Sequence, residues 1–193
     1  MYLFTRSARL GPGNPAEQAS WAISVTEKVN QISELQVSLW SRVFSPGLGT
    51  LAWTAATEDL STLEATDSKL LADSGYLSLL EQGQKYDSGQ GADDSLIQLV
   101  HADADAANTE PQYASVVDAV IAPGQLNKAV EAGVEIAHAA KLATGRPTSF
   151  GVASTGAYGG VAWIVLYDSV EQLQKAEQDL NADSGFSERV DKV

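Results

Sequence analysis

The feature of this sequence that most constrains its fold is an internal repeat with a spacing of 110 residues. Leu51-Ala52-Trp53 matches Val161-Ala162-Trp163, and Ala-Asp-Ser-Gly followed by an aromatic residue recurs at 72–76 and 182–186. In the two thirty-residue windows that begin at residues 51 and 161, eight positions are identical, where roughly two are expected by chance for an average composition. A repeat of this length predicts two tandem copies of one folding unit.

Each copy shows the same order of strand and helix signals. In the first copy these signals predict a strand at 2–10, a helix with Asn14 as N-cap and Pro15 at its first position, strands at 34–44 and 50–57, and a helix from 58 to Gly75. Residues 81–94 are polar and glycine-rich, and we expect a loop there before a fourth strand at 95–101. The second copy repeats the order at 113–122, 124–142, 148–154, 161–167 and 169–181.

This order predicts an α+β fold made of two tandem duplicated ferredoxin-like β-α-β-β-α(-β) units, with antiparallel sheets that form an α+β barrel. We expect a first repeat at 1–101, a linker at 102–112 and a second repeat at 113–193. The counterpart of the strand at 95–101 would begin near 205, which is 95 plus 110, and the sequence ends at Val193. Either this sequence is truncated, or the second repeat lacks its last strand; its sheet is expected to have three strands or to borrow one from a neighbour.

The composition restricts the partners of the chain. It has 12 basic and 25 acidic residues and a net charge of −13, so we expect neither nucleic acid nor an anionic membrane as a partner. The absence of cysteine excludes disulfides, thiolate metal sites and a cysteine nucleophile. No apolar run reaches the roughly 18 residues of a spanning helix, and the N-terminus does not resemble a signal peptide. We therefore expect a cytoplasmic protein.

Two junctions between a strand and a helix, Val120-Ile121-Ala122-Pro123-Gly124-Gln125 and Arg9-Leu10-Gly11-Pro12-Gly13-Asn14, resemble those of the dimeric α+β-barrel superfamily, which includes antibiotic-biosynthesis monooxygenases and NIPSNAP-like proteins. The segment Gly159-Gly160-Val161-Ala162-Trp163, with a helix and then 183–186 behind it, also fits. The resemblance implies paired sheets around a cavity, formed by a homo-oligomer or by the two halves as an intramolecular pseudo-dimer. Known members include cofactor-free monooxygenases, isomerases, decarboxylases, haem enzymes and proteins without known activity. No motif of one of these subgroups is intact here.

Aromatic residues on the predicted strands are candidates for ligand contacts. Trp40, Trp53, Trp163 and Tyr167 lie on strands, and Trp53 matches Trp163 across the repeat. Indole and phenol groups suit a half-polar pocket, but core packing under the helices is the favoured interpretation for the matched tryptophans, and a subunit interface is a third one.

Charged residues interrupt strands that are otherwise apolar or small: Arg6 and Arg42 in the first half and Asp118 in the second. Facing an enclosed cavity, they would need partners, either as an Arg–Asp pair across the pseudo-twofold axis or through an acidic or phenolic ligand over Arg42. Exposure on the strands is the alternative. The candidate ligand-binding residues are therefore Trp40, Arg42, Trp53, Asp118, Trp163 and Tyr167.

Histidine is scarce. His101 ends a predicted strand, and His138 forms a single Glu-x-x-His pattern with Glu135 on a predicted helix. A metal site requires two or three ligands at helical or strand spacing, so we predict no metal and no cofactor, and an ordinary, partly exposed His138.

These patterns predict a soluble α+β-barrel protein that is a non-catalytic small-molecule binder or a structural subunit of an oligomer. The alternative is a cofactor-independent monooxygenase or isomerase that acts on a small aromatic or polyketide-like compound. Scarce histidine and absent cysteine favour the first hypothesis, whereas the aromatic strands and the family resemblance favour the second. Because the polar residues are not duplicated with the framework, we expect a single site per chain.

Overall fold

The computed structural model describes residues 1–103 and 111–192. The chain separates into two compact units, Met1–Leu96 and Ile97–Val193, and each is described by itself. The linker expected at 102–112 lies mostly outside the described residues. The division between the units falls inside the strand Asp87–His101. The repeat boundaries expected from the sequence, 1–101 and 113–193, remain a prediction.

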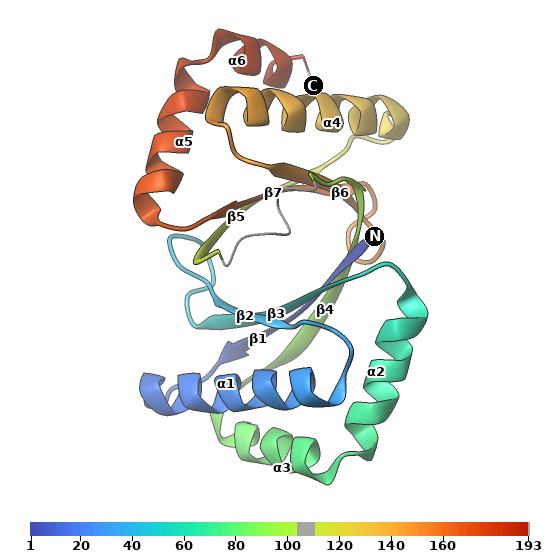
Figure 1. The fold of residues 1–193 in the computed structure, drawn as a ribbon, viewed down its shortest axis with the longest axis vertical. Helices are drawn as coiled ribbons and strands as arrows, with labels where there is room; N and C mark the ends of the chain where they lie inside the picture. The colour runs from blue at the N-terminus through green and yellow to red at the C-terminus, as the bar shows by residue number, and fades with distance from the viewer. Residues whose placement is uncertain (104–110, 193) are drawn as a thin grey trace. The chain divides into compact units, whose positions relative to one another are not determined.

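The first unit places its helices on one side of an antiparallel sheet (Figure 1). Its sheet order is β2-β3-β1-β4. The elements are β1 (Tyr2–Leu10), α1 (Pro15–Ile32), β2 (Ser38–Ser41), β3 (Thr50–Thr57), α2 (Leu60–Ala72), α3 (Ser74–Gly83), the 3₁₀ helix η1 (Gln84–Tyr86) and β4 (Asp87–His101).

The second unit repeats this arrangement, with antiparallel strands in the order β6-β7-β5 and helices on one side of them. The elements are β5 (Tyr113–Val120), α4 (Leu126–Thr144), β6 (Thr148–Ala153), β7 (Gly160–Tyr167), α5 (Val170–Ala182) and α6 (Ser184–Val190). The α+β class and the ferredoxin-like order predicted from the sequence are confirmed.

The end of β4 belongs to the second unit, where it pairs with β6. Ile97 lies opposite Ala153 and Leu99 opposite Gly151, and the register then shifts so that His101 lies opposite Phe150. The sheet of the second unit thus receives a fourth strand beside β6. Among the described residues, no strand lies along the outer edge of β5.

Local capping explains why the Asp-Ser-Gly motif recurs. The Asp73 carboxylate accepts a hydrogen bond from the Tyr76 N–H at 2.7 Å, and the Asp183 carboxylate accepts one from the Phe186 N–H at 2.7 Å. Each aspartate is therefore the N-cap of a new helix. The prediction that Gly75 ends the preceding helix was wrong, because Asp73 ends α2 and Gly75 lies in the first turn of α3.

Two sequence predictions of strand length also need correction. The strand expected at 34–44 is reduced to Ser38–Ser41, because Asn30 on α1 hydrogen-bonds both the N–H and the carbonyl of Val37 and holds the preceding chain against the helix. The polar segment at 81–94 is not a loop: its first residues finish α3 and η1, and the rest is the exposed part of β4. Gly89 and Gly91 adopt positive φ there, a conformation that favours glycine.

The register divides each sheet into a face covered by its helices and a helix-free face. In the second unit, Trp163 lies opposite Val117 and Phe150, and it belongs to the core cluster that includes residues of α4. The alternate residue Ala162 lies opposite Asp118, so Asp118 is on the helix-free face. In the first unit, the cluster of Trp53 with Ala22, Val25 and Val29 marks the covered face in the same way.

Candidate functional site

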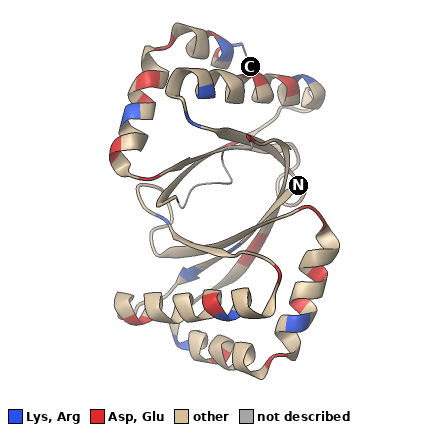
Figure 2. Ribbon diagram, in the orientation of Figure 1, with Lys and Arg blue, Asp and Glu red and all other residues tan. Residues whose placement is uncertain are grey.

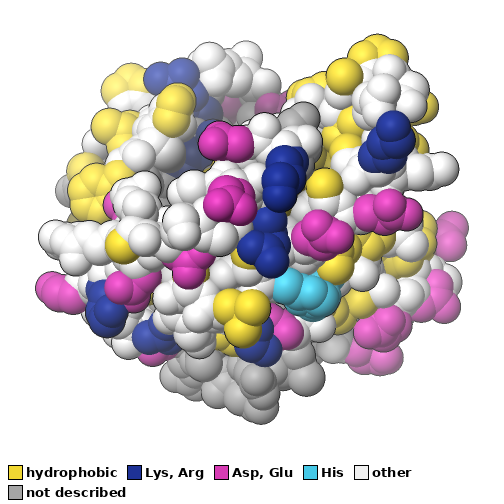
Figure 3. Space-filling view, turned by 90° about the horizontal axis from the view of Figure 1, so that it is seen from above, with side chains coloured by type: hydrophobic (Ala, Val, Ile, Leu, Met, Phe, Trp, Pro, Cys, Tyr) yellow, Lys and Arg dark blue, Asp and Glu magenta, His cyan; other side chains and the backbone are white. Residues whose placement is uncertain are grey.

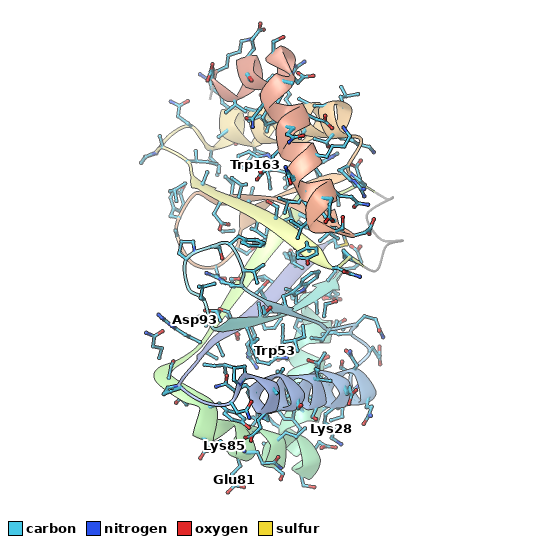
Figure 4. All side chains as sticks on the ribbon, turned by 90° about the vertical axis from the view of Figure 1, so that its left-hand side faces the viewer. Lys28, Trp53, Glu81, Lys85, Asp93 and Trp163 are labelled. Atoms are coloured by element: carbon cyan, nitrogen blue, oxygen red, sulfur yellow. The ribbon has the colours of Figure 1, made fainter. Side chains whose placement is uncertain are left out.

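The two matched tryptophans lie on the helix-covered faces of their units (Figure 4). The Trp53 indole N–H donates to Thr26 Oγ1 on α1 at 3.0 Å, and the Trp163 indole N–H donates to the Gly133 carbonyl on α4 at 2.9 Å. Each indole thus joins a central strand of its sheet, β3 or β7, to the first helix of its unit. This placement agrees with the core-packing interpretation, and a ligand role for either residue remains a prediction.

The other two aromatic candidates differ in their surroundings. Tyr167 is buried, and burial raises the pKa of its phenol above the ordinary value. Trp40 is half-buried on the helix-free face of the first unit, opposite Ala52, and its indole N–H donates to Thr54 Oγ1 at 2.9 Å. A ligand contact for Trp40 remains a prediction.

The charged candidates do not converge within either unit. Arg42 is exposed in the turn after β2, and Asp118 is exposed on β5. Arg6 pairs with Asp94 of its own unit, with Nε–Oδ1 at 2.8 Å and Nη2–Oδ2 at 2.7 Å. This two-bond pair accounts for the strand arginine without a ligand.

The residues that the structure brings together are the two histidines of the chain. The rings of His101 and His138 meet edge to face, with centroids 4.5 Å apart and planes at 83°. His101 comes from the end of β4 and His138 from α4. Because the register shift after Leu99 turns His101 from the helix-free face to the covered face, the β-bulge creates this contact.

A half-buried carboxylate completes what we call the histidine cluster: His101, Asp103, His138 and Lys141. The Lys141 ammonium donates to Asp103 Oδ1 at 3.0 Å, and the Thr148 N–H donates to Asp103 Oδ2 at 3.4 Å. Burial raises the pKa of Asp103, but the hydrogen bond and charge of Lys141 and the Thr148 N–H outweigh it, so the pKa lies below its ordinary value. Asp103 is therefore ionised at neutral pH.

One nitrogen of the cluster lacks a hydrogen bond within the described part of the chain. His101 Nε2 is buried without such a partner, and Asp103 Oδ1, at 3.9 Å, is too distant to accept one. An unpaired buried polar atom is costly and uncommon, so it is a marker of a site.

A surface groove lies on the outer side of His138. It has a volume of about 310 Å³ and is lined by Glu135, His138, Ala139, Leu142 and Arg189. A second hollow of about 300 Å³ shares Glu135 and Arg189 with it, so both run between α4 and α6. Figure 3, which views this end of the molecule, shows histidine, basic and acidic side chains gathered together.

This arrangement can form hydrogen bonds with a ligand, because each imidazole has two ring nitrogens. Within residues 1–103 and 111–192, no group of three His, Cys, Asp or Glu is placed to hold a metal ion. Sequence reasoning assigned the histidines no role because their contact depends on the bulge and on the packing of α4. Their rarity was the one available signal.

The fold and the cluster define an α+β protein of two ferredoxin-like units, the second of which carries two histidines in contact. No model of a known protein family matches the chain, and no curated protein matches its sequence. Solved structures do share its fold.

A "putative monooxygenase" from Fusobacterium nucleatum is 9% identical, with a TM-score of 0.71 over 99% of this chain and 84% of that one. A "putative monooxygenase" from Lactobacillus acidophilus is also 9% identical, with a TM-score of 0.64 over 98% and 85%. An anthrone oxidase-like protein is 12% identical, with a TM-score of 0.57 over 98% and 83%. The resemblance to monooxygenase-like α+β proteins is thus confirmed for the fold alone.

Two properties of the whole chain bear on its partners. Figure 2 shows acidic positions on helices of both units, in keeping with the net charge of −13. No helix among the described residues is long and apolar enough to cross a membrane.

Proposed function

We propose that this chain is a non-catalytic binder of a small organic ligand, and that the groove beside His138 receives the ligand. The observation that carries the proposal is the contact of His101 with His138 behind the groove. The His138 imidazole is exposed to solvent, whereas His101 Nε2 is buried and has no hydrogen-bond partner among the described residues. Such a pair can accept or donate a hydrogen bond without a large change in structure.

The lining suggests the chemical class of the ligand. Leu142 is 85% exposed and gives the groove an apolar wall. Arg189 lines the same groove, and guanidinium groups bind carboxylates with two parallel hydrogen bonds. A volume of about 310 Å³ lies at the lower end of ligand pockets. We therefore expect a small aromatic acid or phenol.

The test uses the fact that the chain has two histidines. A thermal-shift screen with aromatic acids and quinols selects compounds that bind the folded state, and ¹⁵N-imidazole NMR then follows His101 and His138 during titration. We expect ligand-dependent shifts of the His138 resonances. Leu142→Ala should raise the Kd about tenfold, the effect of about 1.4 kcal/mol of lost contact.

The matched control is Leu71→Ala, which truncates an exposed leucine on a helix of the first unit. It should leave the Kd unchanged. The proposal fails if no compound moves either imidazole, or if both leucine variants weaken binding equally.

A second candidate function is a cofactor-independent monooxygenase or isomerase, which the position of the ionised Asp103 carboxylate 3.9 Å from His101 Nε2 favours. A buried imidazole near a carboxylate is suited to remove a proton from a phenol or an activated carbon. Oxygen consumption and product analysis with bound compounds test this alternative, with His101→Gln as the variant. If a bound compound is turned over and His101→Gln abolishes that turnover, the enzyme hypothesis would replace the binding hypothesis.

The remaining expectations are part of the same proposal. They comprise an oligomer or an intramolecular pseudo-dimer, a cytoplasmic location, and no nucleic acid or membrane partner; the high negative charge supports the last of these. Trp40, on a helix-free face, and Asp118, on the other unit's helix-free face, remain candidate contacts for a ligand at the sheets. Asp118→Asn and Trp40→Phe in the same screen test them.

A further inference from the structure

We infer that the hollow next to the proposed groove binds an ammonium group, and that the ligand of this chain is an aromatic α-amino acid. This inference rests on the proposed function of the groove beside His138 and names the chemical class of its ligand more closely. The hollow has a volume of about 300 Å³ and shares Glu135 and Arg189 with the groove. A ligand in the groove therefore lies beside the hollow as well.

One stripe of α4 lines both the hollow and the groove. Its residues recur every three or four positions, a spacing that places helix side chains on one face; they are Ala132, Glu135, His138, Ala139 and Leu142. Glu135 is a charged member of this stripe, and Leu142 is its apolar end. With a rise of about 1.5 Å per residue, these two positions are about 10 Å apart along the helix, a length that one aromatic amino acid spans.

Charged side chains of both signs line the hollow. Glu135 lies on α4, Glu188 and Arg189 lie on α6, and Lys192 follows α6. Within residues 1–103 and 111–192, none of these four side chains forms an ion pair. Two carboxylates and two cations around one hollow suit a ligand that carries both charges, because each charge of the ligand then has a partner of opposite sign.

Arg189 has donors left for the carboxylate of such a ligand. Its Nη1 donates to the Gly185 carbonyl at 2.7 Å, which ties the guanidinium to its own helix. A guanidinium has five N–H donors and binds a carboxylate through two of them. The carboxylate of the amino acid therefore lies at Arg189, the same contact as in the proposed function.

The two glutamates discriminate between an amino acid and a simple acid. Glu135 and Glu188 are both exposed and line the same hollow as Arg189. Their carboxylates attract an ammonium group next to the bound carboxylate, and they repel a ligand that carries a carboxylate alone. An amino acid should therefore bind more tightly than the acid that lacks its amino group.

The apolar end of the groove selects the side chain of the amino acid. Ala139 is small and buried, and His138 and Leu142 are exposed beside it. An aromatic side chain covers more of Leu142 than a short aliphatic one, and it can stack on the His138 imidazole. The groove therefore favours phenylalanine over alanine as a free amino acid.

The first unit does not carry the same charges. At the repeat spacing of 110, Glu188 and Arg189 correspond to positions 78 and 79, which are Ser78 and Leu79. The inference therefore predicts one bound amino acid per chain.

Calorimetric titration of the full chain with three related compounds tests the inference. They are L-phenylalanine, 3-phenylpropanoate, which lacks the amino group, and 2-phenylethylamine, which lacks the carboxylate. Phenylalanine should bind one per chain with a Kd at least fivefold below that of either analogue. This factor corresponds to about 1 kcal/mol, the upper range for one exposed ion pair.

Glu188→Gln and Glu81→Gln form a matched pair of variants. Both remove one exposed negative charge from a helix that begins at an Asp-Ser-Gly motif, so both should melt near the temperature of the wild type. Glu188→Gln should lower the preference for phenylalanine over 3-phenylpropanoate at least threefold. Glu81→Gln, in the first unit, should leave that preference unchanged.

The ¹⁵N-imidazole signal of His138 separates failure of this inference from failure of the proposed function. If 3-phenylpropanoate shifts the signal and binds as tightly as phenylalanine, or if Glu188→Gln leaves the preference unchanged, the inference is overturned and the groove still stands as a site. If phenylalanine binds with the expected preference but does not shift the signal, the hollow binds the ammonium group and the groove beside His138 fails. If none of the three compounds binds, both fail.

Discussion

Gly133 connects α4 to the sheet of the second unit and to Trp163, the tryptophan that matches Trp53 across the repeat. Its carbonyl accepts the Trp163 indole N–H at 2.9 Å, and a Cβ atom at this position would overlap the ring of Phe150. The absence of a side chain is therefore what allows α4 to approach the sheet this closely.

Gly133→Ala should lower the free energy of unfolding by about 1–3 kcal/mol through overpacking, although alanine is the better helix former by about 1 kcal/mol. Urea denaturation measures the change. Gly185→Ala in α6 is the control, since a Cβ there meets only side-chain atoms of Asp183 and Arg189, at 3.2 and 3.4 Å. Equal losses in both variants would contradict the packing argument.

The second prediction at the residue scale concerns Asp103 and pH. Its folded pKa is lower than its unfolded value of about 3.9, so its carboxylate stabilises the fold above pH 4, and this contribution is lost as the pH falls through the folded pKa. Asp103→Asn should therefore be less stable than the wild type at pH 7, and the difference should shrink toward acid pH. A difference that is constant with pH would show that the charge is not responsible.

At the scale of elements, the repeated Asp-Ser-Gly motif acts as a helix start. Asp183 ends α5 and caps α6, which packs against α4 beside the groove. One wall of the groove therefore depends on α6, a helix of seven residues. A helix this short is not stable without its cap and its packing.

Asp183→Ala should lower the free energy of unfolding by about 1 kcal/mol and should speed amide exchange in residues 184–190. Asp183→Asn keeps an oxygen acceptor and should retain most of the stability. Hydrogen-exchange NMR distinguishes the two variants, and unchanged exchange in Asp183→Ala would exclude a capping role.

At the scale of the whole molecule, the two units have separate hydrophobic cores. The first is built around Trp53 and the second around Phe150, and no residue belongs to both clusters. One strand, β4, contributes residues to both units.

We expect the two units to differ in stability when only one core is altered. Phe150→Ala removes a fully buried ring and should cost the second unit about 3–5 kcal/mol, so the Trp163 indole signal should disappear at lower urea than the Trp53 signal. Leu70→Ala, in the core of the first unit, should reverse that order. Coincident loss of both indole signals in both variants would show that the chain unfolds as one cooperative unit.

The amino-acid sequence by itself determined the repeated units and most element positions. The strands at Tyr2–Leu10 and Thr50–Thr57 and the capped start of α1 are confirmed as predicted. These features are local: hydrophobic periodicity, turn residues and a side-chain cap act within a few residues of one another.

Tertiary structure alone decided the features that depend on contacts between distant segments. The β-bulge before His101 changed the face on which that residue lies, and α4 then brought His138 to it from 37 positions further along the chain. The pairing of the end of β4 with β6 likewise joins segments about 50 residues apart. Periodicity indicates which residues are apolar, but it does not indicate which strand lies beside which, and that pairing placed the histidine cluster.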